Sequence, residues 1–349
     1  MNPIERTPHS PSLLRLRAAL ADLDPAALPC AWLEQLVHQH LDVLPLPGGG
    51  STLQRWQALS AVAEHDLSLA KLYEGHTDAL AVMAEVAPGF QPSSGATWGL
   101  WAAESPQARC IVESTAAGPT FLSGAKNWCS GAAHLSHGLL TAWFADGRGP
   151  QLVCLPMHQP AVSVNAGAWQ AVGMAGSASL DVNLRGASAE LVGEPGAYLA
   201  RPGFWQGGAG IAACWYGGAL SLAKTLQRAV QQAAPAQRSA FRLAALGKLD
   251  VLLQATAALL REAAEWIDHH PAEDAAAVAL RVRLAAEATA TRVLDEVGRA
   301  LGATPFCRDA GFARAAADLP VFVRQSHAER DFAALGDRRS TMEDSTWLL

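Results

Sequence analysis

Several features that define other protein classes are missing from this sequence. Its six cysteines lie far apart with no Cys-x-x-Cys pair, which is typical of reduced thiols rather than of a disulfide framework or a zinc site. There is no block of lysine and arginine, and the formal net charge is −6 at pH 7, so we expect no nucleic-acid partner. The opening "MNPIERTPHSPS" lacks the basic-then-apolar pattern of a signal peptide. Together these absences predict a cytoplasmic protein.

One stretch without formal charge, residues 202–223, is long enough to be compared with a membrane span. It contains six glycines and a glutamine, which make a poor lipid-facing helix, and it stands alone in the chain. The stretch therefore predicts a helix buried inside a bundle, and we expect no membrane partner.

The chain changes character after its first quarter. Residues 11–95 are rich in alanine, leucine and glutamate, with apolar residues at helical spacing. The turn-rich "LPLPGGGST" interrupts this zone, and its Ser51 or Thr52 is a candidate cap for the helix that follows. Residues 96–195 are short apolar or alternating runs separated by Gly, Pro, Asn and Asp, the pattern of an antiparallel sheet or a small barrel.

The last zone, residues 203–336, returns to helical spacing, with predicted helix ends before Pro271 and at Gly302. Its apolar stripes and many alanines favour close helix–helix packing. We therefore predict an α+β chain of three parts: an N-terminal helical domain (1–95), a middle antiparallel β-domain that forms a small barrel (96–198) and a C-terminal four-helix bundle (199–349).

Six short motifs follow one another along the chain, and their order is informative: "LPLPGGGS", "WAAES", "FLSGAKNWCSGA", "GMAGSASLDVNLRGASAELVGEPG", "RSAF" and "ALGATPF". In this order and over essentially the full length, the chain resembles the acyl-CoA dehydrogenase family of flavoproteins. The resemblance implies the same three-part fold, with FAD held between the last two domains and a neighbouring subunit. It also implies a homodimer or homotetramer.

Trp128 and Ser130 lie in the third of these motifs. The resemblance implies that Trp128 packs against the flavin ring system and that the Ser130 hydroxyl, where the family usually has threonine, bonds near the reactive edge of the ring. The chemistry fits, because stacking on an indole stabilises a large flat apolar ring and a nearby donor assists hydride acceptance. The alternative for Trp128 is a core tryptophan at a β-turn.

Five further residues are implied to contact FAD. Ala103 and Glu104 stand where the family has Thr-Glu, so a side-chain hydroxyl is lost and backbone amides would serve. Arg238 matches the arginine that reaches the FAD diphosphate from an adjoining subunit, a task that suits a planar guanidinium; an exposed arginine at a helix start is the alternative. Gly302 and Thr304 stand in the glycine turn of the family, with a simple helix C-cap as the alternative.

The catalytic base of the family is missing. Its glutamate usually follows an Arg-Asp pair, and counting forward from Asp318 reaches Ser326, with His327 beside it. These two are the candidate catalytic residues; serine cannot act as a base unaided, whereas histidine transfers protons near neutral pH. His327 as a surface residue of a charged helix is the alternative, and Glu329 would take the position if the register is wrong by about one helical turn.

Three functions stay open. The lead is an FAD-dependent oxidoreductase of acyl-CoA dehydrogenase type, acting on the CH–CH bond of an acyl thioester with an atypical or missing base. The second is a flavin-dependent monooxygenase on the same scaffold, and the third is a non-catalytic, acyl-binding descendant. The loop that usually contacts the thioester is replaced by "SPQA", which counts against ordinary acyl-CoA recognition. The expected partner is a small-molecule substrate, and no metal is expected, because the histidine pairs of the chain lack supporting ligands.

Overall fold

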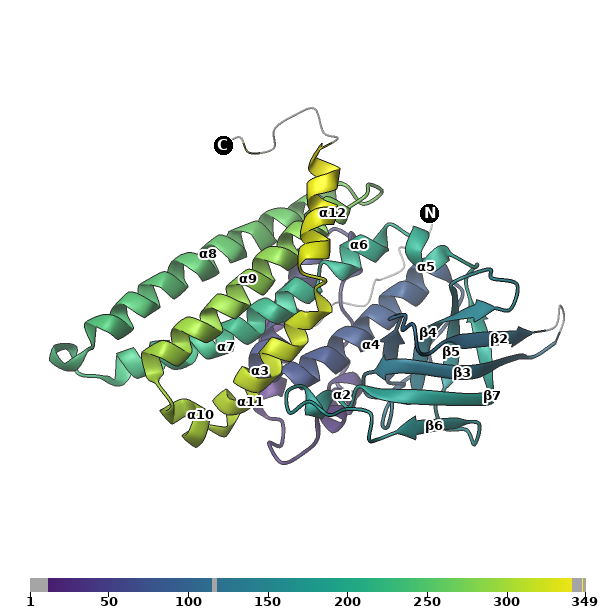
Figure 1. Cartoon of the computed structure of the whole chain (residues 1–349), viewed down its shortest axis with the longest axis horizontal. Helices are drawn as coiled ribbons and strands as arrows, with labels where there is room; N and C mark the ends of the chain where they lie inside the picture. The colour runs from purple at the N-terminus through teal and green to yellow at the C-terminus, as the bar shows by residue number, and fades with distance from the viewer. Residues whose placement is uncertain (1–11, 115–117, 341–346, 348–349) are drawn as a thin grey trace, which may run out of the picture.

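The computed structural model describes residues 12–114, 118–340 and 347 of the 349-residue chain. Helices from both ends of the sequence lie together on one side, and the strands form the other side (Figure 1). This arrangement confirms the predicted order of N-terminal helices, a middle β region and C-terminal helices. The N-terminal helices are α1 (Leu13–Ala21), α2 (Pro29–His38), α3 (Thr52–His65) and α4 (Leu67–Val86).

The seven strands of the described chain form the predicted small barrel. Strands β2, β3, β7, β5 and β4 pair in that order, and β4 returns to β2, which closes the ring. The prediction of an antiparallel sheet is wrong at two places, because β4 pairs in parallel with both β1 and β2. The strands are β1 (Trp98–Trp101), β2 (Cys110–Ser114), β3 (Thr120–Cys129), β4 (His137–Phe144), β5 (Gln151–Pro156), β6 (Val162–Asn165) and β7 (Leu180–Val192).

The C-terminal part is dominated by three long helices. Helix α7 packs against α8, α9 and α11, and α8 packs against α9. The predicted ends hold: α8 stops at His269, before Pro271, and Gly302 ends α9 with a φ of 68° that favours glycine. The elements are α5 (Ala197–Ala200), α6 (Gly203–Gly208), α7 (Ile211–Gln232), α8 (Ala240–His269), α9 (Ala276–Leu301), α10 (Thr304–Arg308), α11 (Ala310–Phe322) and α12 (Glu329–Ser340), with short 3₁₀ turns η1 (Ala175–Ser177), η2 (Pro235–Gln237) and η3 (Val323–Gln325).

Helices α3 and α7 join the two ends of the sequence into one core. They make extensive contact, and a Cβ at Gly217 of α7 would collide with the carbonyl oxygen of Ser60 in α3. Glycine is therefore required for this close approach. The uncharged stretch 202–223 supplies α6 and α7, and α7 is buried along most of its length, as its composition predicts.

The cap of α3 differs from the prediction. Ser51 makes no side-chain capping bond, and Thr52 is already the first helical residue. The carboxylate of Asp268, from the last turn of α8, accepts the N–H of Thr52 at 2.9 Å and its hydroxyl at 2.6 Å, and also accepts the N–H of Gly50 at 3.1 Å. A carboxylate suits the N-terminus of a helix, where unpaired N–H groups and the helix dipole favour negative charge.

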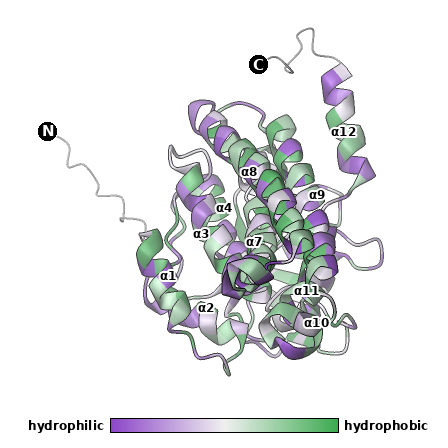
Figure 2. Cartoon of the chain, turned by 90° about the vertical axis from the view of Figure 1, so that its left-hand side faces the viewer, coloured by the Kyte–Doolittle hydropathy of each residue, from purple (hydrophilic) through white to green (hydrophobic). Residues whose placement is uncertain are grey.

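Helix α8 is the one helix of the described chain that is long and apolar enough, by length and composition, to cross a membrane, and only 22% of its most apolar window is buried. The exposed side chains include Phe241, Leu243 and Val251, which are 86%, 46% and 69% exposed. Figure 2 faces this end of the molecule and shows apolar residues along α8. The helix thus exposes large apolar side chains that have no partner in the described part of this chain.

Candidate functional site

Trp128 is not a core tryptophan. It lies in β3 at an irregularity between Lys126 and Cys129, where the register with β7 shifts, and its φ is 57°. A left-handed conformation is strained for an aromatic residue, so the surrounding strands must hold it there. The side chain is 54% exposed, whereas nearby Trp101 is 3% exposed and fills the core. The bulge therefore turns the indole of Trp128 out of the barrel.

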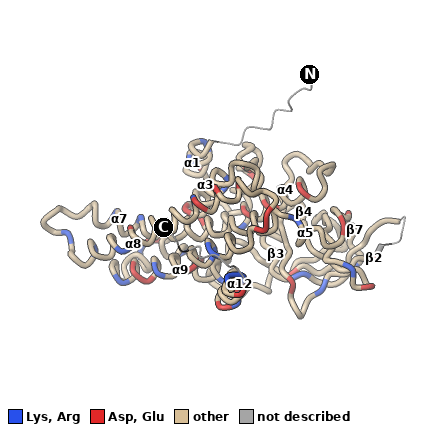
Figure 3. Tube along the Cα trace, turned by 90° about the horizontal axis from the view of Figure 1, so that it is seen from above, with Lys and Arg blue, Asp and Glu red and all other residues tan. Residues whose placement is uncertain are grey.

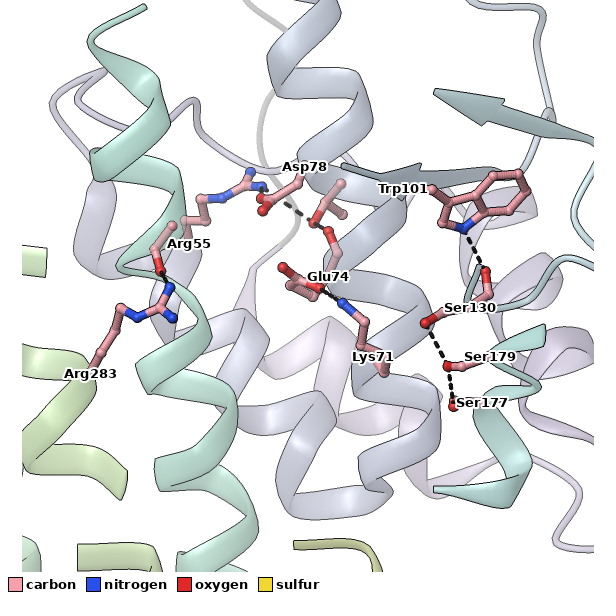
Figure 4. A network of polar contacts seen from close by, with 11 residues as sticks. Arg55, Lys71, Glu74, Asp78, Trp101, Ser130, Ser177, Ser179 and Arg283 are labelled. Atoms are coloured by element: carbon pink, nitrogen blue, oxygen red, sulfur yellow. Dashed lines mark hydrogen bonds and ion pairs between the residues drawn. The ribbon is translucent and has the colours of Figure 1, made fainter. Parts of the chain in front are cut away.

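Ser130 is the end of a chain of hydroxyl groups (Figure 4). It is 8% exposed, its Oγ lies 2.8 Å from Ser179 Oγ, and Ser179 Oγ lies 2.9 Å from Ser177 Oγ. The Ser177 hydroxyl donates to the carbonyl oxygen of Met174 at 2.7 Å. On the other side, the indole N–H of Trp101 donates to the Ser130 carbonyl at 3.0 Å. The position of Ser130 is thus fixed through both its backbone and its side chain.

The far end of this chain is anchored to helix α11. The backbone N–H of Met174 donates to Asp318 Oδ1 at 2.5 Å. Asp318 is 2% exposed, and burial raises the pKa of its carboxyl to about 6. A Cβ at Gly173 would collide with the carbonyl oxygen of Ala317, so the turn before Met174 is seated directly on α11. Asp318 therefore ties the C-terminal helices to the serine chain.

Glu104 ties the end of β1 to the neighbouring strands. Its carboxylate accepts from Lys126 Nζ at 2.7 Å, from the Thr141 hydroxyl at 2.5 Å and from the Trp143 indole at 3.1 Å. Burial raises the pKa of Glu104, but these hydrogen bonds outweigh burial and hold its pKa below the usual value. The Glu104 carboxylate is therefore occupied by these three bonds, which leaves the backbone around exposed Ala103 as the part of this segment that can meet a ligand.

Three residues predicted to contact the cofactor do not lie near Trp128 within a single copy of the chain. Arg238 is exposed in the connection between α7 and α8, where its Nε donates to the Ala233 carbonyl at 3.3 Å. In Figure 1 this connection lies at the end of the helices farthest from the barrel. Gly302 has the geometry of a helix C-cap, with its N–H donating to the Gly298 carbonyl at 2.9 Å, and exposed Thr304 begins α10.

Ser326 and His327 form the turn before α12. The Ser326 hydroxyl accepts the N–H of Ala328 at 3.1 Å, and the His327 N–H donates to Asp331 Oδ2 at 3.1 Å. The imidazole is 62% exposed, with Nδ1 3.3 Å from Asp331 Oδ1. Glu329 is the first residue of α12, a helix crowded with charges of both signs (Figure 3). The position predicted for a carboxylate base thus holds a capping serine and an exposed histidine.

Asp331 also faces a half-buried arginine, Arg283. The Arg283 guanidinium lies 3.9 Å from Asp331 and donates to the carbonyl oxygens of Gly208 at 3.3 Å and Gln325 at 3.1 Å. Burial lowers the pKa of Arg283. Asp331 is 8% exposed and bonded to the backbone of the 326–328 turn, so it holds that turn in place.

A group of charges on α4, each largely but not fully buried, lies outside the set of residues predicted from the sequence. Lys71 Nζ lies 2.8 Å from Glu74, and Asp78 lies 2.5 Å from the guanidinium of Arg55, which is 2% exposed. Burial alone would lower the pKa of Lys71, but Glu74 and Asp78 outweigh it and the pKa is raised. A signal is present in the sequence, because residues 71, 74 and 78 share one face of an otherwise apolar helix.

Helix α4 separates these charges from the serine chain. A Cβ at Gly131 would lie 2.9 Å from Leu72 of α4, so the turn after Ser130 packs against this helix. In Figure 4 the serines lie on one side of α4, while Lys71, Glu74, Asp78 and Arg55 lie toward α7 and α9 on the other. The molecule therefore places two polar groups of different chemistry on opposite faces of one helix.

Comparison with known proteins shows the fold. No protein-family model and no curated protein matches the sequence. Among solved structures, TdsC from Paenibacillus sp. A11-2 in complex with FMN and indole is similar, with a TM-score of 0.76 and 19% identity over 93% of this chain and 94% of that chain. KijD3 with FMN and a dTDP-linked aminosugar has a TM-score of 0.78 and 18% identity over 94% and 90% of the two chains.

A third similar structure is the methanesulfinate monooxygenase MsuC from Pseudomonas fluorescens, with a TM-score of 0.74 and 18% identity over 94% of this chain and 96% of that chain. All three have the acyl-CoA dehydrogenase fold, so the resemblance found in the sequence is confirmed at the level of the fold. At these identities the likeness does not extend to the reaction.

Proposed function

We propose that this chain is a flavin-dependent monooxygenase. The observation that carries the proposal is the turn at Ser326 and His327, where a dehydrogenase of this fold would need a carboxylate to remove a proton from its substrate. The Ser326 hydroxyl accepts the N–H of Ala328, and the carboxylate of Asp331 accepts the N–H of His327. The exposed His327 imidazole is the group left to hold or move a proton there.

Two of the similar structures support this choice. TdsC is described as a dibenzothiophene monooxygenase and MsuC as a methanesulfinate monooxygenase. The dehydrogenation of an acyl thioester predicted from the sequence shares the same fold, and the fold does not separate the two. The missing carboxylate makes the monooxygenase the better-supported function.

The residues of the barrel fit a flavin ring. Trp128 offers an exposed indole face at a fixed bulge, and buried Ser130 stands two residues beyond it with a held hydroxyl. An aromatic face stabilises a flat ring by stacking, and a fixed polar group orients it. A bound flavin would supply the electron transfer and oxygen chemistry, while the chain positions the ring and excludes water.

We further propose that the flavin is FMN, where the sequence predicted FAD. Trp128 and Ser130 would contact the ring system, which both cofactors share. Arg238, the residue predicted for the FAD diphosphate, belongs to the end of the helices farthest from the barrel (Figure 1). FMN has no diphosphate and therefore needs no group in the role predicted for Arg238, and FMN is bound in the TdsC and KijD3 structures.

The exposed apolar side chains of α8 support a homo-oligomer. Phe241, Leu243 and Val251 expose large apolar side chains on one helix, a pattern that marks an interface more often than a free surface. A second copy that packs along α8 would cover exposed apolar side chains and bring its own Arg238 near this helix, since Arg238 lies two residues before α8. Val251→Glu should shift the purified protein toward the monomer in sedimentation, with Asp250→Glu as a control on the same helix.

The function is tested by loading the purified protein with FMN or FAD and comparing the Trp128→Ala variant. Wild type should retain FMN, and the variant should lose it. The loaded protein, reduced without oxygen, is then exposed to oxygen with sulfur- or nitrogen-containing substrates, and separately the oxidised protein is mixed with acyl-CoAs. Oxygen incorporation into a substrate supports the monooxygenase, whereas bleaching of the flavin by an acyl-CoA would establish the dehydrogenase. A protein that takes up neither flavin would leave the non-catalytic alternative.

A further inference from the structure

We propose that Ser130 meets its ligand as a hydrogen-bond acceptor, and that Ser177, Ser179 and Asp318 are positioning residues that fix this polarity. The sequence assigned Ser130 the role of a donor to the flavin. The structure provides a reason to reverse that assignment, because each hydroxyl in the chain has one proton and every proton has a definite destination.

The direction is set at the Met174 end. The Met174 carbonyl can only accept, so the Ser177 hydroxyl donates its single proton to it, across 2.7 Å. Because the Ser177 proton is already used, Ser177 Oγ can only accept from Ser179 Oγ, which lies 2.9 Å away. The Ser179 hydroxyl is therefore the donor of this bond. The same reasoning applies to the next bond. The Ser179 hydroxyl has used its proton, so the Ser130 hydroxyl donates to Ser179 Oγ, 2.8 Å away.

Ser130 therefore has no proton left for a ligand. Reversing the chain would point the Ser177 proton away from the Met174 carbonyl and leave two acceptor oxygens facing each other at 2.7 Å in a buried place. A buried chain of hydroxyls is also cooperative, since each bond polarises the next. Ser130 keeps a lone pair available, and it is 8% exposed beside the exposed Trp128.

The Met174 carbonyl is itself held by its surroundings. The N–H of the same residue donates to Asp318 Oδ1 at 2.5 Å, and Met174 has a left-handed φ of 58°. A second left-handed residue, Ala178, has a φ of 42°, and the Ser177 carbonyl accepts the N–H of Gly131 at 2.8 Å. The turn is thus bonded to α11 on one side and to the residue after Ser130 on the other, so neither end of the serine chain can rotate alone.

The ligand atom that meets Ser130 must consequently carry a hydrogen. This step rests on the proposed function: between the two redox forms of a flavin, only the reduced ring carries an N–H at N5, where the oxidised ring has a bare nitrogen. An acceptor near that edge favours the reduced form. We therefore expect the protein to bind reduced FMN more tightly than oxidised FMN, and to raise the midpoint potential of the bound flavin above that of free FMN.

The test compares the dissociation constants of oxidised and reduced FMN, measured without oxygen, and the midpoint potential of the bound flavin. Wild type should bind the reduced form at least tenfold more tightly. Ser179→Ala removes the acceptor of the Ser130 proton, frees Ser130 to donate, and should reduce this preference at least fivefold. Ser179→Thr restores a hydroxyl and should restore the preference. Ser163→Ala, at an exposed serine of β6, is the matched control and should match wild type.

Two results separate the failure of this inference from the failure of the proposed function. Wild type that binds flavin with equal affinity in both forms, or a Ser179→Ala variant that keeps the full preference, overturns the inference and leaves the function standing. Neutron diffraction of the deuterium-exchanged protein needs no flavin at all. A deuteron on Ser130 Oγ that points to Ser179 supports the proposed polarity, and one that points away from Ser179 overturns it, even if FMN proves not to bind.

Discussion

Polar groups on the two faces of α4 are satisfied in different ways. Toward the barrel, the polar groups are neutral hydroxyls whose bonds run in one direction and leave an acceptor at the end beside Trp128. Toward α7 and α9, they are full charges of opposite sign, such as Arg55 and Asp78, that satisfy one another. The difference indicates that the serine chain is arranged for a ligand, whereas the ion pairs serve mainly to fix the helices in register, since a buried ion pair seldom adds net stability.

The largest effect should come from breaking an ion pair. Arg55→Ala leaves Asp78 buried without its partner, and removal of one member of a buried pair costs about 3–5 kcal/mol. Denaturation in urea should show this loss in the free energy of unfolding. Arg55→Met with Asp78→Leu removes both charges and should recover most of it; if the double variant is as unstable as the single one, the cost lies in packing and not in an unpaired charge.

The next largest effect depends on pH and concerns Asp318. Its folded pKa of about 6 lies above the usual value of 3.8, so the folded state holds the proton more tightly than the unfolded state. The protonated Asp318 therefore contributes its full stabilisation below about pH 4. This contribution to the free energy of unfolding falls as the pH rises through about 6, and the total loss is about 3 kcal/mol.

Asp318→Asn keeps an acceptor for the Met174 N–H and does not ionise. The variant should lack this decline between about pH 4 and 6, and at pH 7 it should be at least as stable as wild type. The free energy of unfolding, measured from pH 4 to pH 8 for both proteins, checks the expectation. A wild-type profile that runs parallel to that of the variant would contradict it.

A smaller effect, on binding and not on stability, is expected at Trp128. Because its indole is exposed, Trp128→Ala should change the free energy of unfolding by no more than about 0.5 kcal/mol. The affinity for FMN should fall by about 2 kcal/mol, roughly 30-fold, through the lost stacking surface. Trp101→Phe is the contrasting variant in the core. Unchanged FMN affinity in Trp128→Ala would remove this residue from the site.

The smallest effect should come from the serine chain itself. Ser130→Ala deletes one neutral hydrogen bond and leaves Ser179 with its bond to Ser177, so the cost in stability should be about 1 kcal/mol. This value, set against the loss in Arg55→Ala, measures how differently the two faces of α4 contribute. A loss from Ser130→Ala as large as that from Arg55→Ala would contradict the comparison.

Features with a local cause were predictable from the sequence. Pro271 and Gly302 mark helix ends because each restricts or frees the backbone at its own position, and the alternation of residues in 96–195 predicts strands for the same reason. The parallel pairing of β4 with β1 and β2 has no local signal, since it depends on how distant strands meet. The same holds for the cap of α3, which comes from Asp268.

The candidate site divides in the same way. A short motif brought Trp128 and Ser130 to attention, and Lys71, Glu74 and Asp78 could have been found as charges within an apolar helix. The left-handed backbone of Trp128 is imposed by the bulge against β7 and cannot be predicted from its neighbours in sequence. The bonding direction at Ser130 depends on groups that are 44 to 49 residues away, so only the folded chain reveals it.

The contact between Thr52 and Asp268 has a consequence for the order of synthesis. The two residues are 216 positions apart, and at roughly 5–20 residues per second a ribosome needs on the order of 10–40 seconds to pass from one to the other. During that interval α3 has emerged without the carboxylate that accepts the first N–H of the helix. The N-terminal helices therefore reach their final stability only after most of the chain has been synthesised. During this interval the nascent chain exposes an uncapped α3 to which a chaperone would bind.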